Sequence, residues 1–183
     1  MNHVGAVRME TERLILRPFE ADDAQAMFDN WASDPEVTKF LTWPTHTSVE
    51  DTRRIIAFWT QVGGCDPSSY DWCIALRETN EPIGSIGVVA LDEGNAAMEI
   101  GYCLTRRFWG QGLVPEAVRA VIHLLFDTVG AKRVTAKHDL NNPKSGRVMQ
   151  KCGMQLLEIR KGGVQNNQGV CDVAVYYIDN PNA

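Results

Sequence analysis

The sequence predicts a single α+β domain of 183 residues, in which helices cover one mostly antiparallel sheet. Two observations give this class. The spacing of apolar residues changes from a helical period in the first third of the chain to a strand-like period between residues 71 and 105. Short polar turns separate these middle strands, which indicates antiparallel neighbours. No linker-like stretch divides the chain, so we expect one domain over 1–183, with a core over 8–178 and partial disorder within 1–12.

The first third predicts one strand followed by helices. Leu14 and Leu16 alternate with Arg13, Ile15 and Arg17, as in a short strand. Helical apolar spacing, capping residues and a first-turn proline then mark the helix starts. The predicted elements are, in order, a strand over 13–19, a helix over 24–31, a short helix begun by Asp34-Pro35 and a helix begun by the capping box Thr47-Ser48-Val49-Glu50.

The remaining chain completes a sheet of about seven strands flanked by about four to five helices. Strands are predicted over 71–77, 82–91, 96–105, 132–138, 154–161 and 171–178, and helices from Gly112 to near Gly130 and over 142–153. The last two strands are expected to form a hairpin through the loop 162–169. We expect 171–178 to be an edge strand, available for pairing in a homodimer.

The composition argues against several classes of function. A formal net charge of -5 does not suit a nucleic-acid partner, because such binding rests on a basic face. The five cysteines show no C-x-x-C pair and no Cys/His pair at metal-ligand spacing, so we expect reduced thiols and no metal. No stretch approaches the ~18 apolar residues of a membrane span, and the N-terminus has no signal-peptide core. These features predict a cytoplasmic protein without a membrane partner.

A glycine-bearing turn runs from Arg107 to Gly112, between a predicted strand and a predicted helix. The first N–H groups of that helix lack partners, and the positive end of its dipole faces the turn. Gly110 and Gly112 allow positive φ and close approach of the backbone to a phosphate. Pro115 helps to define where the helix begins. The turn therefore predicts an anion site, although paired glycines also occur in plain strand-to-helix turns.

The commoner nucleotide loops do not match this turn. A dinucleotide fold has G-x-G-x-x-G in a β-α-β unit, but the third position here is Pro115 and the preceding strands are antiparallel. A Walker phosphate loop needs Gly-Lys-Ser/Thr after the turn, and none follows. A nicotinamide or flavin oxidoreductase is accordingly disfavoured.

Several spaced motifs accompany the turn, which follows the strand Glu99-Ile100-Gly101-Tyr102-Cys103-Leu104. The others are Thr11-Glu12-Arg13-Leu14-Ile15-Leu16-Arg17-Pro18, Trp109-Gly110-Gln111-Gly112, Pro115-Glu116-Ala117 and Asn142-x-x-Ser145-x-x-Val148-x-x-Lys151-Cys152-Gly153. Together they cover nearly the whole chain and resemble the GNAT N-acetyltransferases, in particular the branch with the ribosomal-protein N-terminal (alanine/serine) acetyltransferases. The resemblance implies a GNAT-like mixed sheet, acetyl-CoA as the acetyl donor and an amine acceptor.

The resemblance also implies how coenzyme A binds. In that family the turn amides hold the pyrophosphate, and the pantetheine lies where two neighbouring strands splay apart. The implied contacts are Cys103, Leu104, Arg107, Trp109, Gly110, Gln111, Gly112, Leu113, Asn142 and Lys151. Pro115 departs from the branch, which usually has threonine there, so a hydroxyl contact to phosphate is lost.

Acetyl transfer to an amine needs a base, a polarised carbonyl and a proton for the leaving thiolate. Glu99 shares a predicted strand face with the small residues Gly101 and Cys103, and the resemblance implies a general base there, often working through water. Its residue pattern alone is equally consistent with a solvated carboxylate. Ser145 is implied as the proton donor and Tyr176 is its rival.

The predicted function is acetyl-CoA-dependent N-acetylation of a primary amine, on a protein N-terminus or a small molecule. A non-catalytic acyl-CoA-binding sensor or scaffold of the same fold is the alternative. Asn142 and Ser145 also have structural explanations, as a helix cap and a first-turn residue. Trp43 lies in a predicted loop and is a candidate for the acceptor pocket. The acids Asp22, Asp23, Asp34 and Glu36 offer negative charge to a cationic acceptor.

Overall fold

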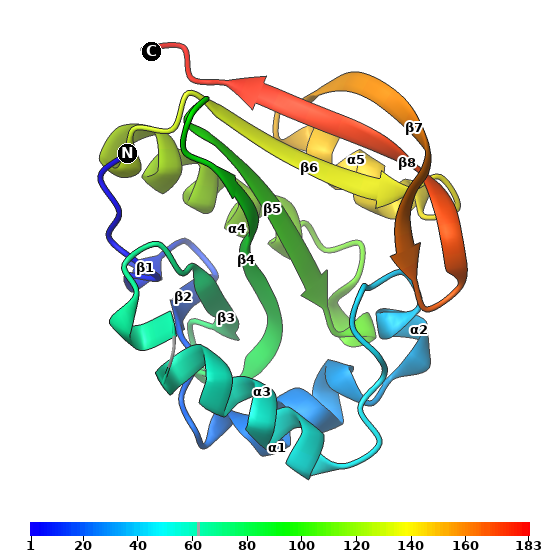
Figure 1. The fold of residues 1–183 in the computed structure, drawn as a ribbon. Helices are drawn as coiled ribbons and strands as arrows, with labels where there is room; N and C mark the ends of the chain where they lie inside the picture. Colours follow the sequence, from blue (N-terminus) through cyan, green and yellow to red (C-terminus); the bar gives the residue numbers. More distant parts are fainter. Residues whose placement is uncertain (62) are drawn as a thin grey trace.

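The computed structural model describes residues 1–61 and 63–183, and one sheet crosses the molecule (Figure 1). Its strands are β1 (Met9–Glu10), β2 (Leu14–Pro18), β3 (Asp71–Leu76), β4 (Pro82–Asp92), β5 (Ala97–Leu104), β6 (Arg133–Asp139), β7 (Gln155–Asn166) and β8 (Gly169–Asp179). Within the described residues their order is β1-β2-β3-β4-β5-β6-β8-β7. All neighbours are antiparallel except β5 and β6, which are parallel. The predicted class is confirmed, with β1 as an additional strand.

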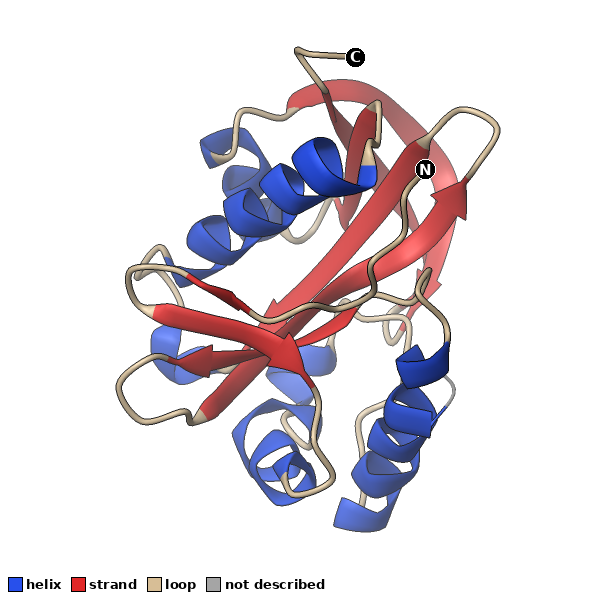
Figure 2. Cartoon of the chain, turned by 90° about the vertical axis from the view of Figure 1, so that its left-hand side faces the viewer, coloured by secondary structure: helices blue, strands red, loops and turns tan. Residues whose placement is uncertain are grey.

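Helices flank this sheet on both sides (Figure 2). They are α1 (Asp23–Met27), α2 (Pro35–Thr38), α3 (Val49–Gln61), α4 (Leu113–Leu124) and α5 (Pro143–Lys151). Single π-helical turns, Phe28–Ala32 and Leu125–Val129, continue α1 and α4. The latter ends at Gly130, which has a φ of 79° as expected for a glycine that terminates a helix.

Two apolar cores lie on opposite faces of the sheet. Trp72 and Ile74 of β3 belong to the larger core, which α4 covers. Cys73 and Ala75 belong to the smaller core, which α1 and α3 cover. Successive side chains of a strand point to opposite faces, so one strand serves both cores.

The same alternation defines the two sides of β5. Ile100 and Leu104 are buried in the larger core, and Tyr102 packs against it. Cys103 is buried in the smaller core. Glu99, Gly101 and Cys103 are alternate residues of β5 and point to the same face. Glu99 therefore lies on the face that α1 and α3 cover.

The cap of α3 differs from the prediction by one residue. The backbone N–H groups of Thr47 and Ser48 both donate to Asp51 Oδ2 at 3.1 Å. Because α3 begins at Val49, the third helical position is Asp51. Glu50 instead forms an ion pair with Arg53.

The C-terminal hairpin is longer than predicted. β7 reaches Asn166 and β8 begins at Gly169, so most of the expected loop 162–169 is strand. A register shift between Arg160 and Val164 accommodates Gly162, whose φ is 56°. Since β8 pairs with both β6 and β7, the prediction that 171–178 is an edge strand is wrong, and β7 forms that edge.

Hydrogen bonds hold the N-terminal residues, for which the sequence predicts partial disorder. The Asn2 N–H donates to the Val129 carbonyl at 2.8 Å, and His3 Nδ1 lies 2.9 Å from the Tyr70 hydroxyl.

None of the described helices has the length and apolar character needed to cross a membrane.

Candidate active site

The turn between β5 and α4 exposes its backbone. Gly110 and Gly112 have φ values of 79° and 80°, the left-handed region predicted for them. A Cβ at Gly110 would meet no atom of the described chain within 4 Å. Gly112 is the N-cap of α4, and among the described residues no side chain caps its first N–H groups. The amides at the start of α4 are therefore available to an anion.

Arg13 ties this turn to the N-terminal end of β2. Its Nη1 donates to the Gln111 carbonyl at 3.0 Å, and its Nε donates to Glu116 Oε2 at 2.7 Å. Thr11 Oγ1 donates to the other oxygen of Glu116 at 2.6 Å. A carboxylate in the first turn of α4 would oppose a bound phosphate, and Arg13 compensates that charge. The motifs that contain Arg13, Gln111 and Glu116 thus meet at the start of α4.

β5 and β6 separate beside the turn. Parallel pairing joins Glu99 to Thr135 and the two residues before each. Beyond this point the described residues of β5 and β6 no longer pair with each other, although β5 continues to Leu104 and β6 to Asp139. Figure 1 shows the two arrows diverging. The result is a wedge with backbone polar groups on its walls, as the resemblance implies.

Glu99 lies at the apex of this wedge and has a cationic partner. Lys137 Nζ is 2.9 Å from Glu99 Oε1, and the two side chains are only 29% and 17% exposed respectively. Glu99 is the last residue of β5 that pairs with β6, and Lys137 is two residues beyond its partner Thr135 on β6. The carboxylate is therefore held in place by an ion pair, rather than standing alone on an open sheet face.

Tyr102 crosses from β5 to α5 on the opposite face. Its hydroxyl donates to the Ser145 carbonyl at 3.1 Å and accepts a hydrogen bond from Ser145 Oγ, also at 3.1 Å. Burial raises the pKa of Tyr102, so the phenol stays protonated at neutral pH. The sequence interpretation missed this residue, although a polar tip at an apolar position of the strand was an available signal.

Asn142 begins α5 without the predicted side-chain cap. Among the described residues its side chain makes no capping hydrogen bond, and its ψ of 64° is not extended. The cap explanation is therefore wrong. Ser145, three residues later in α5, is the residue to which Tyr102 is hydrogen-bonded. Tyr176, the rival proton donor, accepts a hydrogen bond from Gln150 at 3.2 Å, further along α5.

The remaining residues implied for the coenzyme fall into two groups. Trp109 Nε1 donates to the Leu104 carbonyl at 2.7 Å, and Cys103 Sγ lies 3.2 Å from Ser85 Oγ, so these side chains support the turn and the strand before it. Arg107 is directed away from the turn, to Glu81 at 2.5 Å.

Lys151 ends α5 close to the first turn of α4. The thiol of the next residue, Cys152, donates to the Pro115 carbonyl at 3.5 Å. The structure thus brings both ends of α5 toward the turn and the wedge.

Trp43, for which the sequence predicts contact with the acceptor, lies in the loop after α2. Trp43 is half-buried against the smaller core, with its ring centroid 5.3 Å from that of His46. Asn167, at the tip of the β7–β8 hairpin, donates to the Trp43 carbonyl at 2.8 Å. A segment far along the chain therefore holds this loop, which local sequence patterns do not reveal.

Two of the acids considered for a cationic acceptor are already paired. Asp23 forms a buried ion pair with Arg17 at 2.7 Å, and Asp34 pairs with Arg106 at 2.5 Å. No cluster of metal-ligating side chains occurs within 1–61 and 63–183.

The chain is similar in sequence to known acetyltransferases. A family model described as an acetyltransferase (GNAT) domain matches residues 13–155. The chain belongs to this GNAT family. An uncharacterized N-acetyltransferase, p20 of Bacillus licheniformis, is 34% identical over 145 residues, which are 79% of this chain and 80% of that protein. The ribosomal-protein-serine acetyltransferase of Escherichia coli is 28% identical over 137 residues, 74% of this chain and 75% of that one.

Solved structures share the same fold. The microcin C7 self-immunity acetyltransferase MccE, in complex with acetyl-CoA and AMP, has a TM-score of 0.80 at 20% identity, over 92% of this chain and 93% of that one. The family and its named relatives make this GNAT protein an acetyltransferase, and the predicted resemblance is confirmed.

Proposed function

We propose that this acetyltransferase transfers the acetyl group of acetyl-CoA directly to a primary amine. The observation that carries the proposal is the juxtaposition of two features, the uncapped amides at the start of α4 and the wedge between β5 and β6. The first suits a pyrophosphate and the second suits the extended pantetheine arm. Acetyl-CoA in the related fold of MccE supports this choice of donor.

Glu99 is the proposed general base. An amine enters as an ammonium ion at neutral pH and must lose a proton before it attacks the thioester carbonyl. Glu99 lies at the apex of the wedge on the acceptor face, where it can take this proton directly or through a water molecule. Lys137 holds the carboxylate at that point.

Ser145 is the proposed proton donor. Attack of the amine forms a C–N bond and a tetrahedral oxyanion, for which the unpaired backbone N–H groups of β5 are donors. Collapse breaks the C–S bond, and the thiolate takes a proton from Ser145 Oγ. The nitrogen of the adduct loses its second proton as the amide forms, and that proton returns to Ser145 Oγ through water. Tyr102 orients that hydroxyl from the neighbouring strand. Glu99 and Ser145 approach the wedge from opposite faces of the sheet, so base and acid remain separate.

The acceptor is proposed to be the amine of a protein N-terminus or of a small molecule. The name of the Escherichia coli relative, a ribosomal-protein-serine acetyltransferase, supports the first kind. Release of the coenzyme A thiol, measured across a library of peptides and small amines, tests the proposal. We expect release with at least one amine class and a matching mass increase of one acetyl group on that amine. Thiol release without any acetylated amine would contradict it.

A further inference from the structure

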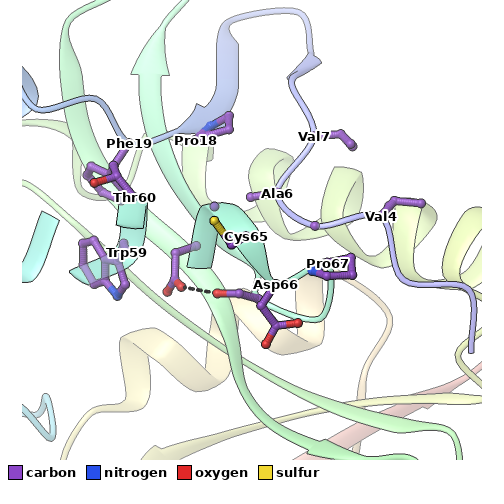
Figure 3. A pocket seen from close by; sticks show the side chains of 14 residues that line it. Val4, Ala6, Val7, Pro18, Phe19, Trp59, Thr60, Cys65, Asp66 and Pro67 are labelled. Carbon is purple, nitrogen blue, oxygen red and sulfur yellow. Dashed lines mark hydrogen bonds between the residues drawn. The ribbon is translucent and has the colours of Figure 1, made fainter. Parts of the chain in front are cut away.

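A cavity of about 470 Å³ lies between the end of α3 and the N-terminal segment. Figure 3 shows Phe19 and Trp59 on one side of it and Val4 and Val7 on the other. The rings of Phe19 and Trp59 are in contact, with centroids 4.8 Å apart and planes tilted by 32°. Asp71 also lines this cavity. Aromatic faces beside a carboxylate are the chemistry that binds an ammonium group.

Asp71 has no cationic partner in the described part of the chain. Its one hydrogen bond from a side chain there comes from Ser69 Oγ at 3.2 Å. Burial raises the pKa of this carboxyl, opposed only by that hydrogen bond. The other aspartate of the cavity differs, because Asp66 accepts hydrogen bonds from both the N–H and the hydroxyl of Ser68. Asp71 is the carboxylate that a bound cation would satisfy.

Asp71 lies on the same sheet face as Glu99. In register, Asp71 is opposite Gly87, and Gly87 is opposite Gly101 on β5. A Cβ at Gly87 would come within 3.2 Å of Asp71 Oδ1, so that oxygen extends over the strand toward β5. The Cα atoms of Asp71 and Glu99 are two strands apart across the sheet and two residues apart along it. Sheet geometry therefore puts them roughly 12 Å from each other.

The sheet face between the two carboxylates carries two glycines, of which Gly87 is buried and Gly101 half-buried. Gly87 and Gly101 have no side chains, and Val89, which is 63% exposed, lies next to Gly101. A methylene chain could cross this surface with one amino group near each carboxylate.

We propose that Asp71 binds a second ammonium group of the acceptor, so that the preferred substrate is a flexible small-molecule diamine that is acetylated at its other end. This inference rests on the proposed N-acetyl transfer. It assigns the aromatic cavity to substrate recognition and leaves the chemistry at Glu99 unchanged.

The test uses α,ω-diaminoalkanes from diaminopropane to diaminodecane, each matched with the alkylamine of equal carbon number. We expect the longer diamines to exceed their matched monoamines in kcat/KM by about tenfold or more, through KM. Asp71→Asn should abolish this preference and leave monoamine turnover unchanged. Asp66→Asn removes an equal charge from the same cavity and should keep the preference.

A calorimetric titration of diaminooctane into the protein saturated with coenzyme A provides a readout that does not need turnover. Binding should be lost in Asp71→Asn and kept in Asp66→Asn. Equal affinity for diamine and monoamine in the unaltered protein, or equal behaviour of the two variants, would overturn the inference. If no amine releases thiol while Asp71-dependent diamine binding persists, the proposed transfer has failed and the cation site stands.

Discussion

Arg13 bridges Glu116 and the Gln111 carbonyl at the start of α4, although these partners are about a hundred residues away in the chain. In a planar trans peptide the C=O and N–H groups point in opposite directions. The bond from Arg13 to the Gln111 carbonyl therefore turns the Gly112 N–H away from Arg13. That orientation suits a donor to the pyrophosphate.

Replacing Arg13 should weaken the binding of acetyl-CoA. Arg13→Met releases the Gln111 carbonyl and leaves the Glu116 charge uncompensated, so we expect about a tenfold rise in the calorimetric Kd. S-acetylpantetheine lacks the pyrophosphate, and its binding should not change. Arg77→Met is the matched control, because Arg77 also contacts Thr11, at 3.2 Å, but not the turn. A similar loss in both variants would refute the role of Arg13.

Glu99→Gln should abolish most turnover while leaving donor binding intact. A general base contributes about 10²-fold to 10⁴-fold to the rate, so kcat should fall by at least two orders of magnitude. Steady-state thiol release gives kcat, and calorimetry with acetyl-CoA gives the Kd. Glu93→Gln, at an exposed carboxylate near His3, is the control. Normal turnover of Glu99→Gln would exclude this base.

Ser145→Ala and Tyr102→Phe separate proton donation from positioning. We expect Ser145→Ala to lower kcat about tenfold or more, because the thiolate then leaves without its proton. Tyr102→Phe keeps Ser145 as the donor but removes the hydrogen bond that orients the Ser145 hydroxyl. The kcat of this variant should therefore fall less, and its free energy of unfolding should drop by about 1 kcal/mol. Urea unfolding and thiol release measure the two effects. Full turnover of Ser145→Ala would remove the assignment and favour water or Tyr176.

Asp23→Ala should strongly destabilise the fold. Arg17 and Asp23 are joined by two hydrogen bonds of 2.7 and 2.8 Å and are almost fully buried. Removing one partner leaves a buried charge, which costs about 3–5 kcal/mol in the free energy of unfolding. Asp29→Ala, at an exposed residue of the next helical turn, should change stability by about 0.5 kcal/mol or less. Equal urea midpoints for the two variants would show that the pair contributes nothing.

Acidification should weaken the fold through His46. Burial lowers the pKa of this imidazole, and the charge of Asp51 only partly opposes the effect. The unfolded chain therefore binds the proton more readily, and stability is lost as the pH falls below about 6.5. His46→Gln should reduce the slope of unfolding free energy against pH in this range. An unchanged slope would place the acid sensitivity elsewhere.

Local patterns predicted most of the secondary structure because each element carries its own signal. The period of apolar residues indicated the helices and strands, and glycines marked their ends. The cap of α3 was misplaced because Glu50 and Asp51 are both acidic, and only the helix start distinguishes them. The edge strand was misassigned because strand order depends on which distant segments pair.

The candidate site was predictable where residues act through the backbone. Gly110 and Gly112 have the positive φ values that their residue type suggested. Contacts between distant segments, such as Tyr102 with Ser145 and Arg13 with Glu116, leave no periodic trace in one sequence. Whether the residues implied for coenzyme A do bind it stays a prediction.

Calorimetric titration of the unaltered protein with acetyl-CoA, coenzyme A and NAD tests the central claim most directly. The open turn and the wedge predict micromolar binding of acetyl-CoA and of coenzyme A, with no detectable binding of NAD. Pro115 stands where the resemblance implies a threonine hydroxyl beside the phosphate, so the measured affinity also tests the effect of this departure. Tight binding of NAD, or failure to bind either coenzyme A species, would contradict the account.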